Sequence, residues 1–120
     1  MRIFTLGLFL IPFLSLAQQT LPDPLEAGWK GQKVCEVLLD NASVRMLKCT
    51  FPPSFGHEKH FHKKHVGYAL RGGIFQINDE EGIREVQIPS GYTFYNESVV
   101  WHEVLNIGTD TAIFLIVEPK

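Results

Sequence analysis

The chain has 120 residues, 45% of them hydrophobic, and its 11 basic residues against 13 acidic ones give a formal net charge of −2. One domain is expected at this length. The charge balance excludes an electrostatic attraction to nucleic acid or to an anionic membrane surface, so no nucleic-acid partner is expected.

The first 17 residues have the pattern of a secretory signal peptide. Met1 and Arg2 give a positive start, residues 3–14 are mostly apolar, and Ser15 and Ala17 are small residues at the −3 and −1 positions of a cleavage site. The apolar run is shorter than the about 20 residues that span a bilayer. We therefore predict a signal peptide over residues 1–17.

The alternative for this segment is a membrane-embedded N-terminal helix. Pro12 interrupts the apolar run, and no cysteine follows the cleavage site to carry a lipid anchor. We expect an exported protein, periplasmic or secreted, without a stable membrane anchor.

A β-hairpin is predicted near the start of the mature chain. After an irregular segment over residues 18–32, residues 34–39 and 44–51 flank a polar turn. With Ala42 at the turn centre, the register pairs opposite charges and apolar side chains. The predicted pairs are Cys35–Cys49, Glu36–Lys48, Val37–Leu47 and Leu38–Met46.

The two cysteines of this hairpin leave two alternatives. In an oxidising compartment Cys35 and Cys49 can form a disulfide, which for so short a loop would add about 3 kcal/mol of stability. Otherwise both are small buried hydrophobes.

The rest of the chain predicts further strands and almost no helix. Turn signals separate short segments that are apolar or alternate in polarity. Eight strands are expected in all, at residues 34–39, 44–51, 66–70, 74–77, 83–88, 92–95, 99–105 and 111–117. This spacing is typical of an all-β sandwich or barrel, and we expect one such domain over residues 33–120.

The histidines are the strongest functional signal. Four of the five lie between residues 57 and 65, and His102 stands apart. His60 and His62, two residues apart, would point the same way from a strand. Imidazole is the commonest metal ligand, so a third nitrogen from a distant strand would complete a metal site.

Two histidines have simpler interpretations. His57 lies among prolines and glycine, before the expected strand, and is predicted to be a loop residue at the barrel mouth. His102, beside Trp101, could instead be a hydrogen-bonded core residue.

Four short patterns extend the signal beyond the histidines. They are His60-x-His62, Tyr68-x-Leu70-x-Gly72, Pro89-x-Gly91 and His102-x3-Asn106-x-Gly108. Together they resemble the motifs of the small single-domain cupins, over about residues 33–119. The resemblance implies a jelly-roll barrel, also called a double-stranded β-helix.

The chain departs from the cupin motifs at several positions. The second motif keeps its spacing from Gly91 to Asn106, but Glu97 replaces its proline and Val99 its second glycine. In the first motif Ser54 stands where the leading glycine is expected.

The glutamate ligand of the cupin motif is missing, and its place falls on His65. Small exported cupins share this H-x-H-x2-H form, so the resemblance implies His60, His62, His65 and His102 as metal ligands. The residues alone leave His65 open. Its spacing of three from His62 puts it on the opposite face of an unbroken strand, unless a bulge at residues 63–64 turns it back.

A site of imidazoles alone would leave the full charge of a divalent metal acting on whatever fills its open positions. Such ligands suit a transition metal, and the sequence does not choose among Fe, Zn, Ni, Cu and Mn. A small-molecule ligand is expected in the barrel. The aromatic candidates for its walls are Phe51, Phe75, Tyr92, Phe94, Tyr95, Trp101 and Phe114, although most are also expected in the core.

Three function classes stay open at this point. The resemblance favours a metal-dependent enzyme, an Fe(II) dioxygenase before an isomerase or hydrolase. The second class is a non-catalytic barrel that binds metal or a small ligand, and the third is an assembly protein that forms a homodimer. Arg45 and Arg71 could contact an anionic substrate or pair with a carboxylate, and a surface position is expected first for both.

Overall fold

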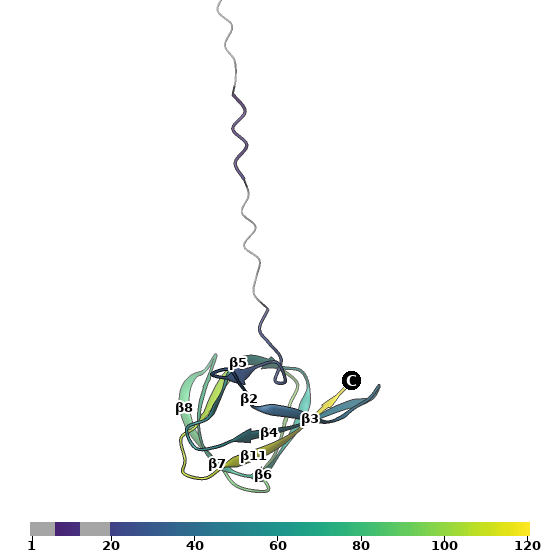
Figure 1. Cartoon of the computed structure of the whole chain (residues 1–120), viewed down its shortest axis with the longest axis vertical. Helices are drawn as coiled ribbons and strands as arrows, with labels where there is room; N and C mark the ends of the chain where they lie inside the picture. The colour runs from purple at the N-terminus through teal and green to yellow at the C-terminus, as the bar shows by residue number, and fades with distance from the viewer. Residues whose placement is uncertain (1–6, 13–19) are drawn as a thin grey trace, which may run out of the picture.

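The computed structural model describes residues 7–12 and 20–120 (Figure 1). Most of the predicted signal peptide, residues 1–17, lies outside these ranges, so the export of the protein stays a prediction. Residues 7–12 belong to no helix or strand. Within the described ranges, no helix is long and apolar enough to cross a membrane.

The described residues form strands and no helix, which confirms the predicted all-β class. The strands are β1 (Gly28–Trp29), β2 (Gln32–Lys33), β3 (Cys35–Asp40), β4 (Val44–Phe51), β5 (Gly56–His62), β6 (His65–Arg71), β7 (Gly73–Asp79), β8 (Gly82–Ile88), β9 (Thr93–Asn96), β10 (Val99–Asn106) and β11 (Ala112–Pro119). All eight strands expected from the sequence are present, with ends that differ from the expected ones by at most two residues.

Two large antiparallel sheets make the jelly-roll barrel that the sequence predicted. One has the order β5-β10-β7-β8 and the other β3-β4-β11-β6-β9. In Figure 1 the two sheets wrap around a common interior. Every second residue of β11, from Ala112 through Phe114 to Ile116, is buried between them, as the period of a strand requires.

The segment predicted to be irregular, residues 18–32, contains a small hairpin of β1 and β2. Lys30 and Gly31 connect these strands with φ values of 48° and 80°. Positive φ at both turn residues is the type I′ geometry that matches the twist of a two-residue hairpin. Asn-Gly or Asp-Gly usually occupies this turn, so the sequence Lys30-Gly31 did not indicate a hairpin.

The predicted register of the β3–β4 hairpin is confirmed for its first three pairs, Cys35–Cys49, Glu36–Lys48 and Val37–Leu47. The fourth predicted pair is wrong, because the register shifts after Val37 and Leu39 lies opposite Met46. Leu38 is therefore the extra residue of a β-bulge, which alternation of polarity does not reveal.

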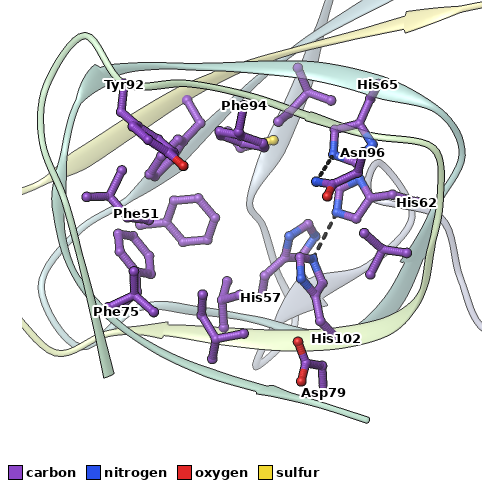
Figure 2. A pocket seen from close by; sticks show the side chains of 18 of the residues that line it. Phe51, His57, His62, His65, Phe75, Asp79, Tyr92, Phe94, Asn96 and His102 are labelled. Carbon is purple, nitrogen blue, oxygen red and sulfur yellow. Dashed lines mark hydrogen bonds between the residues drawn. The ribbon is translucent and has the colours of Figure 1, made fainter. Parts of the chain in front are cut away.

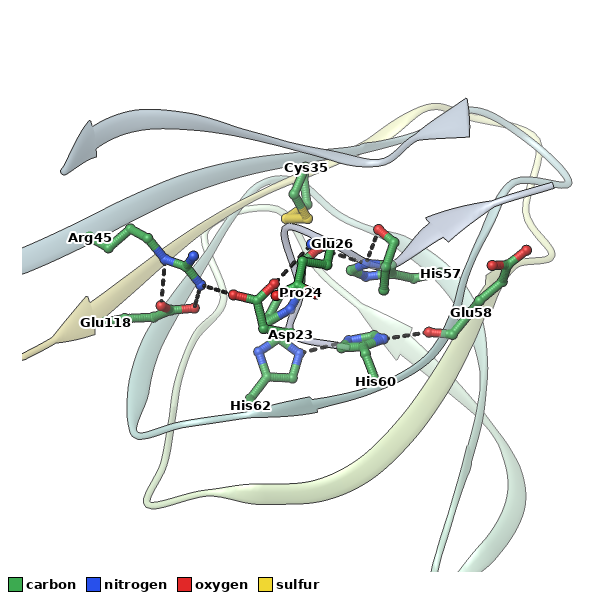
Figure 3. Close-up of a disulfide and its surroundings, with 12 residues drawn as sticks. Asp23, Pro24, Glu26, Cys35, Arg45, His57, Glu58, His60, His62 and Glu118 are labelled. Carbon is green, nitrogen blue, oxygen red and sulfur yellow. Dashed lines mark hydrogen bonds and ion pairs between the residues drawn. A yellow bond between two sulfur atoms is a disulfide. The ribbon is translucent and has the colours of Figure 1, made fainter. Parts of the chain in front are cut away.

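A disulfide joins Cys35 and Cys49, and it settles the alternative that the sequence left open (Figure 3). Reducing this bond is expected to lower the free energy of unfolding by about 3 kcal/mol, since the bond closes a loop of about 15 residues in the unfolded chain. Urea unfolding with and without a thiol reductant measures the difference.

The control for that measurement is the Cys35→Ala/Cys49→Ala variant. The sequence has two cysteines, so this variant should unfold at the same urea concentration with and without reductant. Equal stability of the oxidised and reduced native protein would contradict the prediction.

The outer face of the five-stranded sheet is apolar along β6. Val66, Tyr68 and Leu70 are 37%, 41% and 45% exposed, while His65 and Ala69 on the same strand are buried. The homodimer considered from the sequence stays a prediction.

Candidate metal centre

The site is built where β5 and β10 pair in the four-stranded sheet. His60 lies directly opposite His102, and His62 lies opposite Val99. Between these pairs β10 holds one residue more than β5, which is a β-bulge. Residues directly opposite each other in an antiparallel pair point to the same side, so His60, His62 and His102 face the barrel interior together, whereas the bulge brings Val99 to that side as well. Figure 2 shows His62 and His102 at the cavity.

The three imidazoles meet through their Nε2 atoms. The Nε2 of His60 lies 2.9 Å from that of His62 and 2.9 Å from that of His102, and the Nε2 atoms of His62 and His102 are 3.0 Å apart. Among the described residues, these three histidines form a group that could hold a metal ion.

Hydrogen bonding fixes the tautomer of His60. Its Nδ1–H donates to the carbonyl oxygen of Glu58 at 2.6 Å, so its Nε2 carries a lone pair. A backbone carbonyl in this role is the usual partner of a metal-ligating histidine. With no proton on the Nε2 of His60, the three Nε2 contacts cannot all be hydrogen bonds.

The spacing of the three nitrogens fits a shared metal. For nitrogens about 2.1 Å from a metal, a separation of 2.9–3.0 Å corresponds to angles of about 90°, whereas tetrahedral angles would set them about 3.4 Å apart. Three nitrogens at about 90° occupy one face of an octahedron, as in facial sites that keep positions open for ligands.

The second ring nitrogen of His62 lacks a partner of the kind that the Nδ1 of His60 has. The Nδ1 of His62 is buried and has no hydrogen-bond partner in the described part of the chain. A neutral imidazole must carry its proton on one nitrogen. If the Nε2 of His62 binds a metal, the proton sits on Nδ1, and the metal bond offsets the about 1–3 kcal/mol of an unpaired buried donor.

Burial keeps these imidazoles neutral. It lowers the pKa of His60 to about 2 and that of His102 to about 4, with further contributions from neighbouring histidines. Burial also lowers the pKa of His62 far below its usual range, and His102 and His60 add to the effect. All three therefore present lone pairs at neutral pH, as metal ligands must.

His65 follows a different path from the one predicted. A bulge in an unbroken strand is wrong, since β5 ends at His62 and β6 begins at His65 in the other sheet. The bend at residues 63–64 carries the chain between the sheets. This crossing turns His65 inward, where it is 2% exposed and its ring centroid lies 4.6 Å from that of His62.

His65 is held by its own hydrogen bonds. Its Nδ1–H donates to the carbonyl oxygen of Lys63 at 2.7 Å, and the Nδ2 of Asn96 lies 3.4 Å from its Nε2. His65 does not belong to the group formed by the other three histidines. Its role as a fourth ligand stays a prediction.

His57 was predicted to lie in a loop, and this is wrong. Strand β5 already begins at Gly56, and His57 is 3% exposed. Between the pairs His57–Val104 and His60–His102, β5 holds one residue more than β10. This second bulge points His57 and His60 to the same side despite their spacing of three.

The ring of His57 connects the metal centre to the N-terminal segment. Its ring packs on that of His60, with 3.8 Å between the ring centroids and 32° between the ring planes. Its Nε2–H donates to the carbonyl oxygen of Pro24 at 2.9 Å, and the carbonyl oxygen of Ala27 lies 3.2 Å from the same nitrogen. Burial lowers the pKa of His57, although these carbonyls oppose the shift. The neutral ring of His57 thus packs against the ring of His60 and helps to fix its orientation.

Arg45 holds the same segment by pairing with two carboxylates, which was one of its alternatives, and it is less exposed than the surface position that was expected first. Its Nε donates to Glu118 at 2.8 Å and its Nη2 to Asp23 at 2.9 Å (Figure 3). The side chains of Arg45 and Glu118 are 17% and 8% exposed. The hydrogen bond to Glu118 is the main cause that raises the pKa of Arg45.

Replacing Arg45 by methionine is expected to lower the free energy of unfolding by about 2 kcal/mol, because two partly buried carboxylates lose their partner. Urea unfolding measures the change. The matched control is Arg84→Met, which breaks the more exposed pair with Asp79 and should change stability by about 0.5 kcal/mol or less. Equal effects of the two substitutions would contradict the prediction.

The histidines open onto a cavity of about 560 Å³ between the two sheets. Five of the seven aromatic candidates line it: Phe51, Phe75, Tyr92, Phe94 and Phe114. The other two lie outside it. Tyr95 is 53% exposed, and Trp101 packs under the Nζ of Lys59 at 4.3 Å.

Comparison with known proteins identifies the fold. No protein-family model matches the chain, and no curated protein matches its sequence. A solved cupin domain from Bordetella pertussis Tohama I is similar with a TM-score of 0.68 and 25% identity, over 72% of this chain and 92% of that one.

Two further solved structures have the same fold. An RmlC-like cupin family protein with a double-stranded β-helix fold, from Methanocaldococcus jannaschii, has a TM-score of 0.58 and 18% identity, over 88% of this chain and 93% of that one. A predicted oxalate decarboxylase from Thermotoga maritima has a TM-score of 0.53 and 21% identity, over 69% and 76%. The strand order of this chain and these likenesses show that it has the double-stranded β-helix fold of the small cupin domains.

Proposed function

We propose that this cupin is an exported metalloenzyme that holds one divalent transition metal and acts on a small molecule in its cavity. The observation that carries the proposal is the triangle of Nε2 atoms of His60, His62 and His102, with edges of 2.9–3.0 Å. Three ligands on one face would leave positions open for substrate and oxygen, and the resemblance to cupins favours Fe(II)-dependent dioxygenation as the reaction class.

The residues around the candidate metal centre have definable parts in this function. His60, His62 and His102 would hold the metal, which would supply Lewis acidity to a ligand bound beside them. His60 is oriented by the carbonyl of Glu58 and by the ring of His57. The aromatic walls would displace water from around a bound ligand, which would strengthen the electrostatic interactions that it makes.

The metal content of the mature protein, residues 18–120 without an affinity tag, tests the proposal. Mass spectrometry of the purified protein is expected to find about one equivalent of a transition metal, and the His60→Ala/His62→Ala variant is expected to lose it. The metal content of a His65→Ala variant shows whether His65 is a ligand. If the variant keeps the metal, three histidines bind it; if the variant loses the metal, His65 is the fourth ligand.

A protein that holds no metal after anaerobic reconstitution with Fe, Ni, Zn, Cu or Mn would overturn the proposal. It would leave the alternative of a non-catalytic barrel that binds an organic ligand. Stoichiometric metal in both the native protein and the double variant would also contradict the assignment of the ligands.

A further inference from the structure

The cavity has two chemically different ends. The histidines occupy one end, and the rings of Phe51, Phe75 and Tyr92 lie opposite them in Figure 2. Phe51 packs edge-to-face on Phe75 with 5.3 Å between centroids, and Phe114 packs on Phe75 at 5.5 Å. Aliphatic side chains fill the wall between the rings, among them Ile77, Val86, Ile88 and Val104.

Such walls select against a ligand that is polar along its length. A hydroxyl placed against Phe75 or Ile88 finds no partner in the ring or aliphatic groups that surround it, and an unpaired buried polar group loses about 1–3 kcal/mol. A sugar or polyol would suffer this loss several times over. A flat aromatic body would instead pack on rings that already favour edge-to-face and offset contacts.

The charge at the histidine end specifies the other half of the ligand. The three imidazoles are neutral, so they leave the charge of a divalent metal uncompensated. The carboxylate that lines the cavity, Asp79, accepts from Arg84 through both oxygens at 2.9 and 3.0 Å, so this pair neutralises itself. The ligand must therefore bring the negative charge.

We propose that the cavity binds a planar aromatic small molecule whose anionic oxygen donors point toward His60, His62 and His102. This inference rests on the metal function proposed above and names its substrate class. The volume of about 560 Å³ lies within the about 300–1,000 Å³ of small-molecule sites and suits a body of more than one ring.

Three probes separate the two halves of this ligand. 3-Hydroxy-2-naphthoate carries both the rings and the oxygen donors, glycolate carries a hydroxyl and a carboxylate without rings, and naphthalene carries rings without donors. Titration calorimetry and the visible spectrum of cobalt-loaded protein measure their binding, and metal-free protein is titrated in parallel.

The naphthoate is expected to bind the cobalt-loaded protein at least about ten-fold more tightly than glycolate, and at least about ten-fold more tightly than it binds the metal-free protein. It should also change the cobalt spectrum, whereas naphthalene should bind without such a change. These results are expected only if the apolar walls and the metal both contribute to binding of the naphthoate.

A matched pair of tyrosines tests the walls directly. Tyr92 lines the cavity and stacks on Phe94 with 6.1 Å between centroids, whereas Tyr95 lies outside the cavity and is 53% exposed. Tyr92→Ser should weaken naphthoate binding about ten-fold and leave glycolate binding unchanged. Tyr95→Ser should change neither.

The outcomes distinguish this inference from the proposed function. Stoichiometric cobalt together with equal affinities for glycolate and the naphthoate would overturn the substrate class and keep the metal site. Protein that holds no cobalt would overturn the metal function, and the anionic half of the ligand with it. If protein without cobalt still binds the naphthoate more tightly than glycolate, the result supports the aromatic part of the ligand. Equal binding of the two probes by that protein would overturn the aromatic part as well.

Discussion

Metal-free protein is expected to lose its stability steeply as the pH falls from 7 toward 4. Burial holds the pKa of His60 at about 2 and that of His102 at about 4 in the native state, and lowers those of His62 and His57 as well. Histidines of the unfolded chain take up protons below a pH of about 6.5. The unfolded state then binds more protons than the native state, so the free energy of unfolding falls with the pH.

The expected slope is large because several histidines act together. Each contributes about 1.4 kcal/mol per pH unit once its unfolded form is protonated and its native form is not. The contribution of His102 to the loss ends near its native pKa of about 4, whereas that of His60 continues toward about 2. A domain with a total stability of about 5–15 kcal/mol should therefore unfold within this range.

Urea unfolding of metal-free protein at pH 7.5, 6.5, 5.5 and 4.5 measures this effect. A His60→Gln/His62→Gln/His102→Gln variant is the control, and its stability should depend far less on pH over the same interval. A native protein as stable at pH 4.5 as at 7.5 would show that these imidazoles are not held neutral by the fold.

Replacing Asn106 by leucine is expected to be among the most destabilising single substitutions in the barrel. Its side chain is fully buried, and its Nδ2 donates to the carbonyls of Phe51 at 2.9 Å and Asp110 at 2.8 Å. Its Oδ1 accepts from the backbone N–H of Gly108 at 2.9 Å. Leucine has a similar size but leaves these backbone groups unpaired, at about 1–3 kcal/mol each, for a total of about 4 kcal/mol.

Urea unfolding of Asn106→Leu beside Asn78→Leu checks this expectation. Asn78 makes a partly buried hydrogen bond to Glu103 on the sheet surface, and its replacement should lower the free energy of unfolding by about 1 kcal/mol or less. The expectation fails if the two variants lose comparable stability.

Much of the barrel could be predicted because its strands obey local rules. Alternating polarity and turn residues marked all eight expected strands, and cross-strand pairing placed Cys35 opposite Cys49. The predicted strand pairing fails where one extra residue in a strand shifts the alternation of side chains between the two faces of the sheet. Leu38 bulges out of β3, and no propensity marks that position.

The candidate metal centre was predictable only in part, because its geometry depends on how two distant strands pair. The spacing of two made His60 and His62 neighbours from the sequence alone. The inward direction of His57 depends on a bulge in β5, and that of His102 follows from its pairing with His60; both are visible only once the two strands are paired. The resemblance to cupins supplied His102, which local pattern could not join to the others.

His65 shows a further limit of reasoning from periodicity. Its spacing from His62 was interpreted as one continuous strand, but the chain changes sheets at residues 63–64. Two lysines give no turn signal of the kind that glycine or proline provides. Val66 and Tyr68 form an apolar face that lies outside the barrel, although hydrophobicity alone would place it inside.

The Cys35–Cys49 disulfide also affects whether strand β3 can pair with another protein chain. Strand β3 is at the edge of its sheet and exposes Val37, Leu38 and Leu39, which is the kind of strand that recruits another chain by backbone pairing. The covalent bond to β4 keeps the start of β3 in its own sheet, so the strand cannot be exchanged with that of a neighbouring copy while the bond is intact. Oxidation of this hairpin thus protects against intermolecular strand exchange, and reduction would remove that protection.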